Sequence, residues 1–169
     1  MPPPFSDTNL VISMMPRPVH LLALLLIPLA CACSRKPETL IEEGYDQKAM
    51  DEAIARARQE VDYFIAALEK GEGTDFAVKA PIEDDGKVEH FWLTDVAYRD
   101  GVFEGTIGND PGIVDNVEFG QNWTINRSEI SDWMFLRDEK IYGNYTMRPL
   151  LETMPEEEAE MWRSQLAEP

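Results

Sequence analysis

Residues 88–107 read VEHFWLTDVAYRDGVFEGTI and predict a β-hairpin. Their first half is rich in aromatic and β-branched residues, which favour strands. Asp100-Gly101 is typical of a two-residue type I′ loop, and such a loop fixes the register of the strands on either side of it. The expected cross-strand pairs are Arg99 with Val102, Tyr98 with Phe103, Val96 with Gly105 and Thr94 with Ile107.

This register assigns the side chains of the hairpin to two faces, because successive residues of a strand point to opposite sides. One face should carry Trp92, Val96, Tyr98, Phe103 and Ile107. The other face of the first strand should hold Phe91, Leu93 and Ala97. Since both faces are apolar enough to need cover, we expect this strand to lie in the interior of a sheet.

Other segments on both sides of the hairpin also favour strands by their alternation and β-branched content. They are Phe76–Ile82, Ile113–Val117, Trp123–Ile125 and a second hairpin of Trp133–Leu136 with Lys140–Tyr145. The turn-like stretches between them are 83–86, 109–112 and 137–139, with a break at Gly120. Asn126 and Glu129 match a capping pattern for a single helical turn through Ile130, Ser131 and Asp132.

Two regions predict helices. From Gln47 to Lys70 apolar residues recur every three or four positions, which predicts one amphipathic helix over residues 46–71 with Asp46 as N-cap and Gly71 as stop. Its polar face mixes acidic and basic residues, unlike a cationic helix on a membrane surface, so we expect it to pack on the core.

At the carboxyl end, Thr146 is expected to cap a short helix that ends near Met154. Pro155 should open a last, acidic helix with Trp162 and Leu166 facing inward. Runs of strands flanked by helices, without βαβ alternation, favour an α+β fold. We expect a twisted antiparallel sheet of about five or six strands, either open or curled in a barrel-like way.

The amino-terminal region predicts export. A basic Arg17 precedes the apolar run His20–Ala30, as in a secretory signal, with translation starting at Met1, Met14 or Met15. This run is too short to span a bilayer, which needs about 20 apolar residues. Residues 1–32 are therefore interpreted as a signal peptide.

The signal ends in Leu29-Ala30-Cys31-Ala32-Cys33, which resembles the bacterial lipoprotein box. The resemblance implies a diacylglycerol on Cys33 and an acyl chain such as palmitate on the new amino terminus, and two or three chains make a stable anchor. Arg35, where an inner-membrane lipoprotein would carry Asp, implies the outer membrane with the domain facing the periplasm. A disulfide, or a secretory signal without lipid, is the alternative for the two cysteines. Residues 33–45, broken by Pro37, suit a tether.

The residues 91–111, 129–134 and 142–148 resemble, in that order, the YegJ-like bacterial family, a domain of unknown function numbered 2314. The resemblance covers residues 75–151 and implies no activity, cofactor or catalytic residue. The predicted organisation is a signal peptide (1–32), a lipidated tether (33–45), the amphipathic helix (46–71), the YegJ-like α+β domain (75–151) and an acidic helix (152–169).

The 32 acidic and 15 basic residues give a net charge of −17. Such a charge repels nucleic acid and favours a solvated surface or a basic partner. A hard-cation site built from Asp95, Asp110, Asp115 and Asp132 matches no calcium-loop spacing. Nucleotide-binding glycine loops are absent from the sequence. We therefore expect neither a metal nor another cofactor.

Two classes of function remain. A non-enzymatic module that binds a basic protein or an envelope component is favoured, since the sequence shows no nucleophile–base pair and Ser128 and Ser131 are explained by helix capping. The alternative is a periplasmic hydrolase in which His90 acts with Asp95 or Asp132. We expect no catalytic residue, lipidation at Cys33, and partner binding by His90, Trp92, Asp132 and Trp133.

Overall fold

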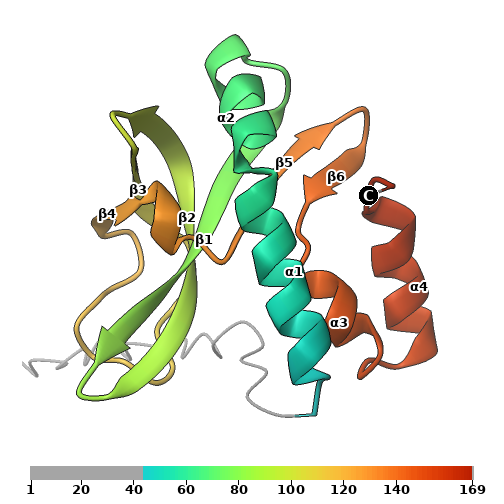
Figure 1. The fold of residues 1–169 in the computed structure, drawn as a ribbon. Helices are drawn as coiled ribbons and strands as arrows, with labels where there is room; N and C mark the ends of the chain where they lie inside the picture. The colour runs from blue at the N-terminus through green and yellow to red at the C-terminus, as the bar shows by residue number, and fades with distance from the viewer. Residues whose placement is uncertain (1–43, 169) are drawn as a thin grey trace, which may run out of the picture. The chain divides into compact units, whose positions relative to one another are not determined.

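A computed structural model describes residues 44–168, so the predicted signal peptide, the lipidation at Cys33 and nearly all of the tether lie outside the described residues. The elements, coloured along the chain in Figure 1, are α1 Gln47–Gln59, α2 Val61–Lys70, β1 Thr74–Asp84, β2 Lys87–Arg99, β3 Val102–Ile107, β4 Asn122–Asn126, the 3₁₀ turn η1 Arg127–Glu129, β5 Asp132–Arg137, β6 Lys140–Gly143, α3 Met147–Leu151 and α4 Glu156–Gln165. None of these helices is long and apolar enough to cross a membrane.

The strands form one six-stranded antiparallel sheet in the order β4-β3-β2-β1-β5-β6. The predicted α+β class and strand number are confirmed, and β2 lies in the interior of the sheet as expected. The sheet is open, with β4 and β6 at its edges, so the barrel-like alternative is wrong.

The β2–β3 hairpin has the predicted two-residue loop. Asp100 and Gly101 both have positive φ, 51° and 84°, which a type I′ turn requires. Arg99 pairs with Val102 and Tyr98 with Phe103, as expected.

From Thr94 toward the amino end of β2, the predicted register is wrong by one residue. The reason is a β-bulge between Thr94 and Ala97. Asp95 adopts a left-handed conformation with φ 52° within this bulge. The observed pairs are Leu93 with Ile107 and Thr94 with Thr106.

The bulge also changes which side chains share a face. Phe91, Leu93 and Val96 are all buried in the core, although the predicted alternation separated Val96 from the other two. Ala97 is exposed, and Trp92 is only partly buried. The predicted alternation therefore holds among residues on the same side of the bulge. It fails between residues on opposite sides, because the bulge exchanges the two faces of the strand.

The predicted single helix over 46–71 is broken at Glu60 into α1 and α2. Its ends are as predicted, since Asp46 accepts a hydrogen bond from the Ala49 N–H and Gly71 is left-handed. At the break, the Glu60 carboxylate accepts from the Tyr145 hydroxyl and the Arg56 guanidinium. Burial alone would raise the pKa of the Glu60 carboxyl, but the hydrogen bonds from Tyr145 and Arg56 have a larger, opposite effect. The pKa of Glu60 therefore lies below its ordinary value. The break is held by a tertiary contact rather than by a proline or glycine.

The predicted strand Ile113–Val117 does not form. Its first N–H groups, with that of Gly112, donate to the buried carboxylate of Glu89: Gly112 at 3.0 Å, Ile113 at 2.9 Å and Val114 at 3.3 Å. Val114 and Val117 are buried in the core. Because a side chain satisfies these backbone donors, the segment needs no neighbouring strand.

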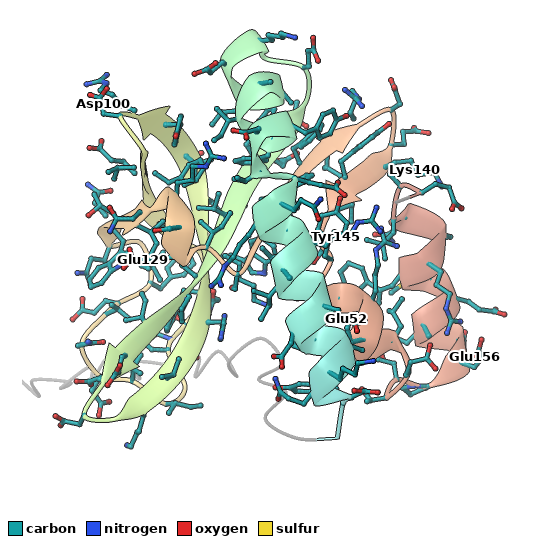
Figure 2. All side chains as sticks on the ribbon, viewed as in Figure 1. Glu52, Asp100, Glu129, Lys140, Tyr145 and Glu156 are labelled. Atoms are coloured by element: carbon teal, nitrogen blue, oxygen red, sulfur yellow. The ribbon has the colours of Figure 1, made fainter. Side chains whose placement is uncertain are left out.

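The carboxyl-terminal helices lie close to where they were expected. α3 ends at Leu151 rather than near Met154, and the Thr146 hydroxyl does not cap it. Glu156 opens α4 (Figure 2). Leu166 is buried after the end of this helix. Ala167 N–H donates to Ile141 O at 2.8 Å, which places the last residues alongside β6.

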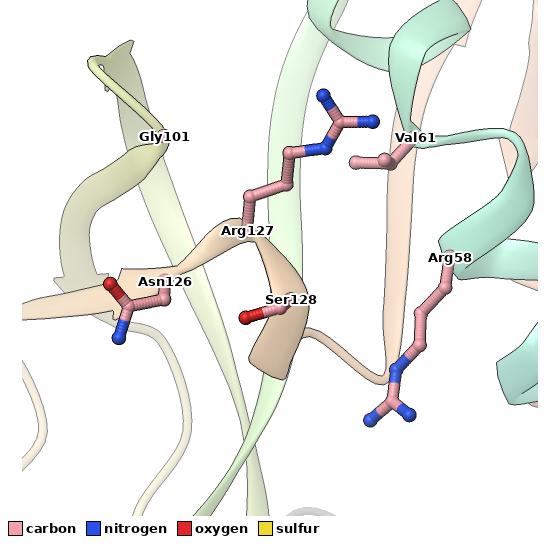
Figure 3. Close-up of a pocket in the computed structure, with 6 residues that line it drawn as sticks. All are labelled: Arg58, Val61, Gly101, Asn126, Arg127 and Ser128. Carbon is pink, nitrogen blue, oxygen red and sulfur yellow. The ribbon is translucent and has the colours of Figure 1, made fainter.

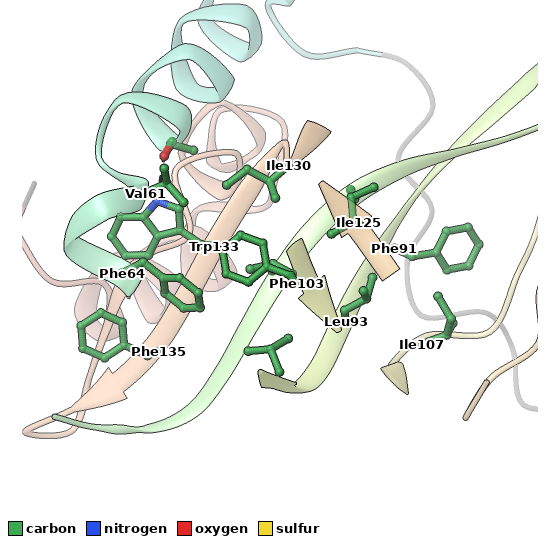
Figure 4. Packing of buried hydrophobic residues seen from close by; sticks show 14 of the residues in the cluster. Val61, Phe64, Phe91, Leu93, Phe103, Ile107, Ile125, Ile130, Trp133 and Phe135 are labelled. Carbon is green, nitrogen blue, oxygen red and sulfur yellow. Dashed lines mark hydrogen bonds between the residues drawn. The ribbon is translucent and has the colours of Figure 1, made fainter. Parts of the chain in front are cut away.

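The main core lies between α1–α2 and one face of the sheet (Figure 4). Phe64 on α2 packs against Trp133 and Phe103, with ring centroids 5.5 and 5.9 Å away. A smaller cluster joins α3, α4 and β6 through Leu151, Ala159 and Leu166.

Candidate functional site

Asp132 is fully buried at the start of β5. Its Oδ1 accepts from the backbone N–H groups of Trp133 (2.9 Å) and Tyr145 (3.1 Å), and its Oδ2 accepts from Thr146 N–H (2.8 Å) and Oγ1 (2.7 Å). Burial raises the pKa of Asp132, against these hydrogen bonds and the charge of Lys79. This carboxylate joins β5 to the segment before α3, and the Thr146 hydroxyl serves it instead of capping the helix.

Lys79 and Trp92 lie opposite each other on neighbouring strands β1 and β2. The Lys79 ammonium is 5.4 Å from the centre of the Trp92 ring and 3.4 Å from Thr146 Oγ1. Burial lowers the pKa of Lys79, while the charge of Asp132 acts in the opposite direction. The partly exposed Trp92 therefore lies beside a half-buried cation.

His90 and Ser131 form a pair that the sequence did not predict. The His90 Nδ1 is 2.8 Å from Ser131 Oγ, and Ser131 is only 1% exposed. Burial of the ring, with the charges of Lys79 and Arg58, lowers the pKa of His90 to about 4, although the residue as a whole keeps an exposed surface. The sequence analysis found no nucleophile–base pair, and this contact between a serine hydroxyl and an imidazole was not anticipated there. The two residues are 41 positions apart, so no spacing motif could have revealed them.

Asp132 does not complete this pair as the acid of a triad. All four of its hydrogen bonds go to Trp133, Tyr145 and Thr146, and none to the imidazole. Trp133 is also in the core, 1% exposed, with its Nε1–H donating to Ala57 O at 2.8 Å. Of the four predicted partner-binding residues, only His90 and Trp92 have surface that a partner can reach in this conformation.

The edge strand β4 borders a hollow of about 500 Å³ on β3 and β4. Two carboxylates, Asp95 and Glu104, line it together with the partly buried Trp123 and neighbouring small and polar residues. The sequence identified Asp95 as a possible cation ligand or as a possible carboxylate partner of His90, and Trp123 as part of a strand. It gave no sign that a bulge would bring Asp95 to β3.

A second hollow, also of about 500 Å³, lies between η1 and the α1–α2 junction (Figure 3). Its lining residues are Arg58, Val61, Gly101, Asn126, Arg127 and Ser128. Neither arginine stands out in the sequence, because one belongs to a helix pattern and the other to a capping turn. Among residues 44–168, no group of three or more His, Cys, Asp or Glu side chains is placed to hold a metal ion.

Residues 47–167 match the family described as "Uncharacterized protein conserved in bacteria (DUF2314)". The uncharacterized protein YegJ of Escherichia coli K12 is 56% identical over 133 residues, which cover 79% of this chain and 87% of YegJ. A putative ankyrin repeat protein of Neisseria meningitidis serogroup B is 37% identical over 126 residues, which cover 64% of this chain and 47% of that protein. No solved structure matches the chain.

Proposed function

We propose, from the premise that the chain belongs to the bacterial DUF2314 family, that it is a lipid-anchored envelope protein whose domain binds a basic, extended segment of a partner. The observation that carries this proposal is the bare edge strand β4 beside the hollow lined by Asp95 and Glu104. The partner adds a strand to β4, and its basic side chains meet the two carboxylates.

β4 lacks the residues that usually protect an edge strand from pairing with another strand. Natural edge strands are usually protected by charged residues, proline or bulges, and Asn122-Trp-Thr-Ile-Asn126 has none of these. The other edge, β6, is partly covered by Leu166 and Ala167.

The hydrogen bonds next to β4 show which of its groups are available. Arg127 N–H donates to Gly101 O and Ile107 N–H donates to Gln121 O, each at 2.9 Å. In an antiparallel pair such bonds recur at every second residue. The backbone groups of Asn122 and Thr124 therefore point away from β3, toward an incoming strand.

The binding test uses a peptide of alternating lysine and valine as a basic strand probe. Thr124→Pro removes the outward N–H without removing a bond to β3, and we expect it to abolish binding. Thr124→Val keeps that N–H and should bind like the wild type. Glu104→Gln should weaken binding about three- to fivefold, as for loss of one exposed ion pair. Equal binding by the proline and valine variants would exclude strand addition.

The envelope location rests on Cys33 and its flanking residues and is tested separately. In the native bacterium, Cys33→Ser should release the protein from the outer-membrane fraction and remove the mass of the acyl chains. A Cys33→Ser protein that stays membrane-bound with unchanged mass would contradict the anchor. Crosslinking and pull-down of the lipidated protein from its envelope should recover a partner with a basic segment.

The relative named as an ankyrin repeat protein is consistent with a binding role. Ankyrin repeats stack into extended concave binding surfaces, and this chain matches 47% of that protein's length.

A hydrolase is the second candidate, and the Ser131–His90 pair favours it. The pair lacks a carboxylate on the imidazole and its serine is buried, so we rank it below binding. Ester hydrolysis that disappears in both folded Ser131→Ala and folded His90→Gln variants would reverse this ranking.

A further inference from the structure

The edge strand β4 has a sequence that reads almost the same in both directions. It is Asn122-Trp123-Thr124-Ile125-Asn126, with an asparagine at each end, a bulky apolar residue next to each asparagine, and Thr124 at the centre. β4 is the outermost strand on its side of the sheet (Figure 1). A second copy of this strand, running antiparallel about Thr124, therefore matches it residue by residue, as an interface between identical copies requires.

The backbone groups of β4 also have the right phase for such a pair. The hydrogen bonds next to β4 leave the groups of Asn122, Thr124 and Asn126 pointing away from β3. With Thr124 opposite Thr124, these two residues exchange both of their hydrogen bonds. The Asn122 N–H of each copy then donates to the Asn126 carbonyl of the other. The Asn126 N–H needs no further acceptor, because it already donates to Glu129 Oε2 at 3.0 Å.

The side chains that meet across this pair are compatible. The partly exposed Trp123 lies opposite Ile125 of the second copy. An aromatic residue opposite a β-branched one, and threonine opposite threonine, both stabilise a sheet. Asn122 lies opposite Asn126, so the pair brings no charged residue of β4 against another.

The acidic residue next to β4 lies too far from the centre of this pair to prevent it. Glu104 of β3 lies opposite Thr124, so the Glu104 residues of two copies are three strand spacings apart, about 14 Å. This separation exceeds the screening length of about 8 Å at physiological ionic strength. The net charge of −17 on each chain is repulsive over longer distances, so self-pairing should become tighter as salt is added.

We propose that β4 pairs with β4 of a second copy about a two-fold axis at Thr124, and that this homodimer covers the binding edge until a basic segment displaces one copy. The regulatory step rests on the proposed function, because it concerns the same edge, whereas the self-pairing needs no other partner. A two-fold pair is closed and leaves no β4 edge exposed. The homodimer therefore protects an edge that has no charged residue, proline or bulge of its own.

The test places charges on the proposed axis and measures self-association of the full chain in detergent by sedimentation equilibrium. Thr124→Glu and Thr124→Lys each bring like charges together in a homodimer, so each should weaken self-association about tenfold. An equal mixture of the two variants brings glutamate opposite lysine and should restore a dimer as tight as that of the wild type. This recovery also shows that both variants are folded. Gln165→Glu and Gln165→Lys, at an exposed position on α4, should dimerise like the wild type.

The alternating lysine–valine peptide separates this inference from the proposed function. It should convert the wild-type dimer to monomers with bound peptide, and it should bind the monomeric Thr124→Glu at least as tightly as it binds the wild type. If Thr124→Glu is monomeric but binds no peptide, the proposed function fails and the self-pairing stands. A wild type that stays monomeric at about 1 mM, a dimer that persists in both Thr124 variants, or a mixture no tighter than either variant alone would overturn the self-pairing. Peptide bound to an intact dimer would overturn the regulation.

Discussion

Replacing Asp132 with asparagine tests whether this buried carboxylate holds β5 to the segment before α3. The carboxylate accepts four hydrogen bonds, two on each oxygen. In Asp132→Asn the amide oxygen keeps the bonds from Trp133 and Tyr145, but an amide donor replaces Oδ2. The Thr146 hydroxyl can rotate and accept, whereas the Thr146 N–H then faces another donor.

One buried N–H without an acceptor costs about 1–3 kcal/mol. Loss of the attraction to Lys79 adds to this cost, and relief from burying a charge offsets part of it. We expect Asp132→Asn to lower the free energy of unfolding by about 2–3 kcal/mol. Asp132→Ala, which leaves all four donors without a partner, should cost about 4 kcal/mol or more.

The measurement is equilibrium unfolding in urea at pH 7, followed by the fluorescence of the tryptophans, of which Trp133 is buried beside the mutation. The matched control is Asp138→Asn in the exposed β5–β6 loop, where φ is 51° and asparagine fits equally well. This control should change the free energy by less than about 0.5 kcal/mol. If Asp132→Asn behaves like the control, the carboxylate does not hold these segments together.

Two further predictions concern pH and packing. The pKa of His90 is about 4 in the folded protein, below its ordinary value, so its contribution to stability is present above about pH 6.5 and is lost as the pH falls toward 4. Between pH 7 and pH 4.5, the free energy of unfolding of the wild type should therefore fall by about 1 kcal/mol more than that of His90→Gln, after allowing for solvent screening. The measurement is urea unfolding at each pH, and parallel pH profiles of the two proteins would contradict this expectation. Gly143→Ala should lower the free energy of unfolding by more than about 3 kcal/mol, since its Cβ would overlap the Trp133 carbonyl and ring. Gly86 has nearly the same φ, but its Cβ would point into open space, so Gly86→Ala should cost only about 1–2 kcal/mol. Thermal unfolding of the two variants measures the difference. Equal losses in the two glycine variants would show that strain, and not overlap, determines the cost.

The features that local chemistry determines could be predicted from the sequence. Asp100-Gly101 gave the loop type and the first two pairs of the hairpin, and Asp46 and Gly71 gave the ends of the helical region. Three separated blocks of residues gave the family, which the match over residues 47–167 confirms.

The predictions of the long helix and of the strand at Ile113 were wrong because side chains distant in the sequence contact these segments. The helix is broken at Glu60, whose carboxylate accepts a hydrogen bond from Tyr145, 85 residues later. Glu89 satisfies the N–H groups around Ile113 and makes a strand unnecessary. The bulge at Asp95 moved the register by one residue, and no turn signal announces it.

The candidate sites were harder to predict than the fold. Asp132 and Trp133 were predicted from the sequence to bind a partner, yet both side chains are buried in the interior of the protein. Arg58 and Arg127 were passed over, since each arginine has an ordinary explanation in its own helix or turn. Pairs such as His90 with Ser131 depend on strand pairing across tens of residues, and only the folded chain brings them together.

The outer side of β6 is covered by Leu166 and Ala167, which the ribosome adds after all six strands. Leu166 bridges to Ile141, and Arg148 donates to Ala167 O at 3.0 Å. Because synthesis starts at the amino end, every strand is already made when this cover arrives. A nascent chain that ends before Leu166 therefore exposes a second bare edge, and the addition of Leu166 and Ala167 leaves β4 as the uncovered edge of the sheet in residues 44–168.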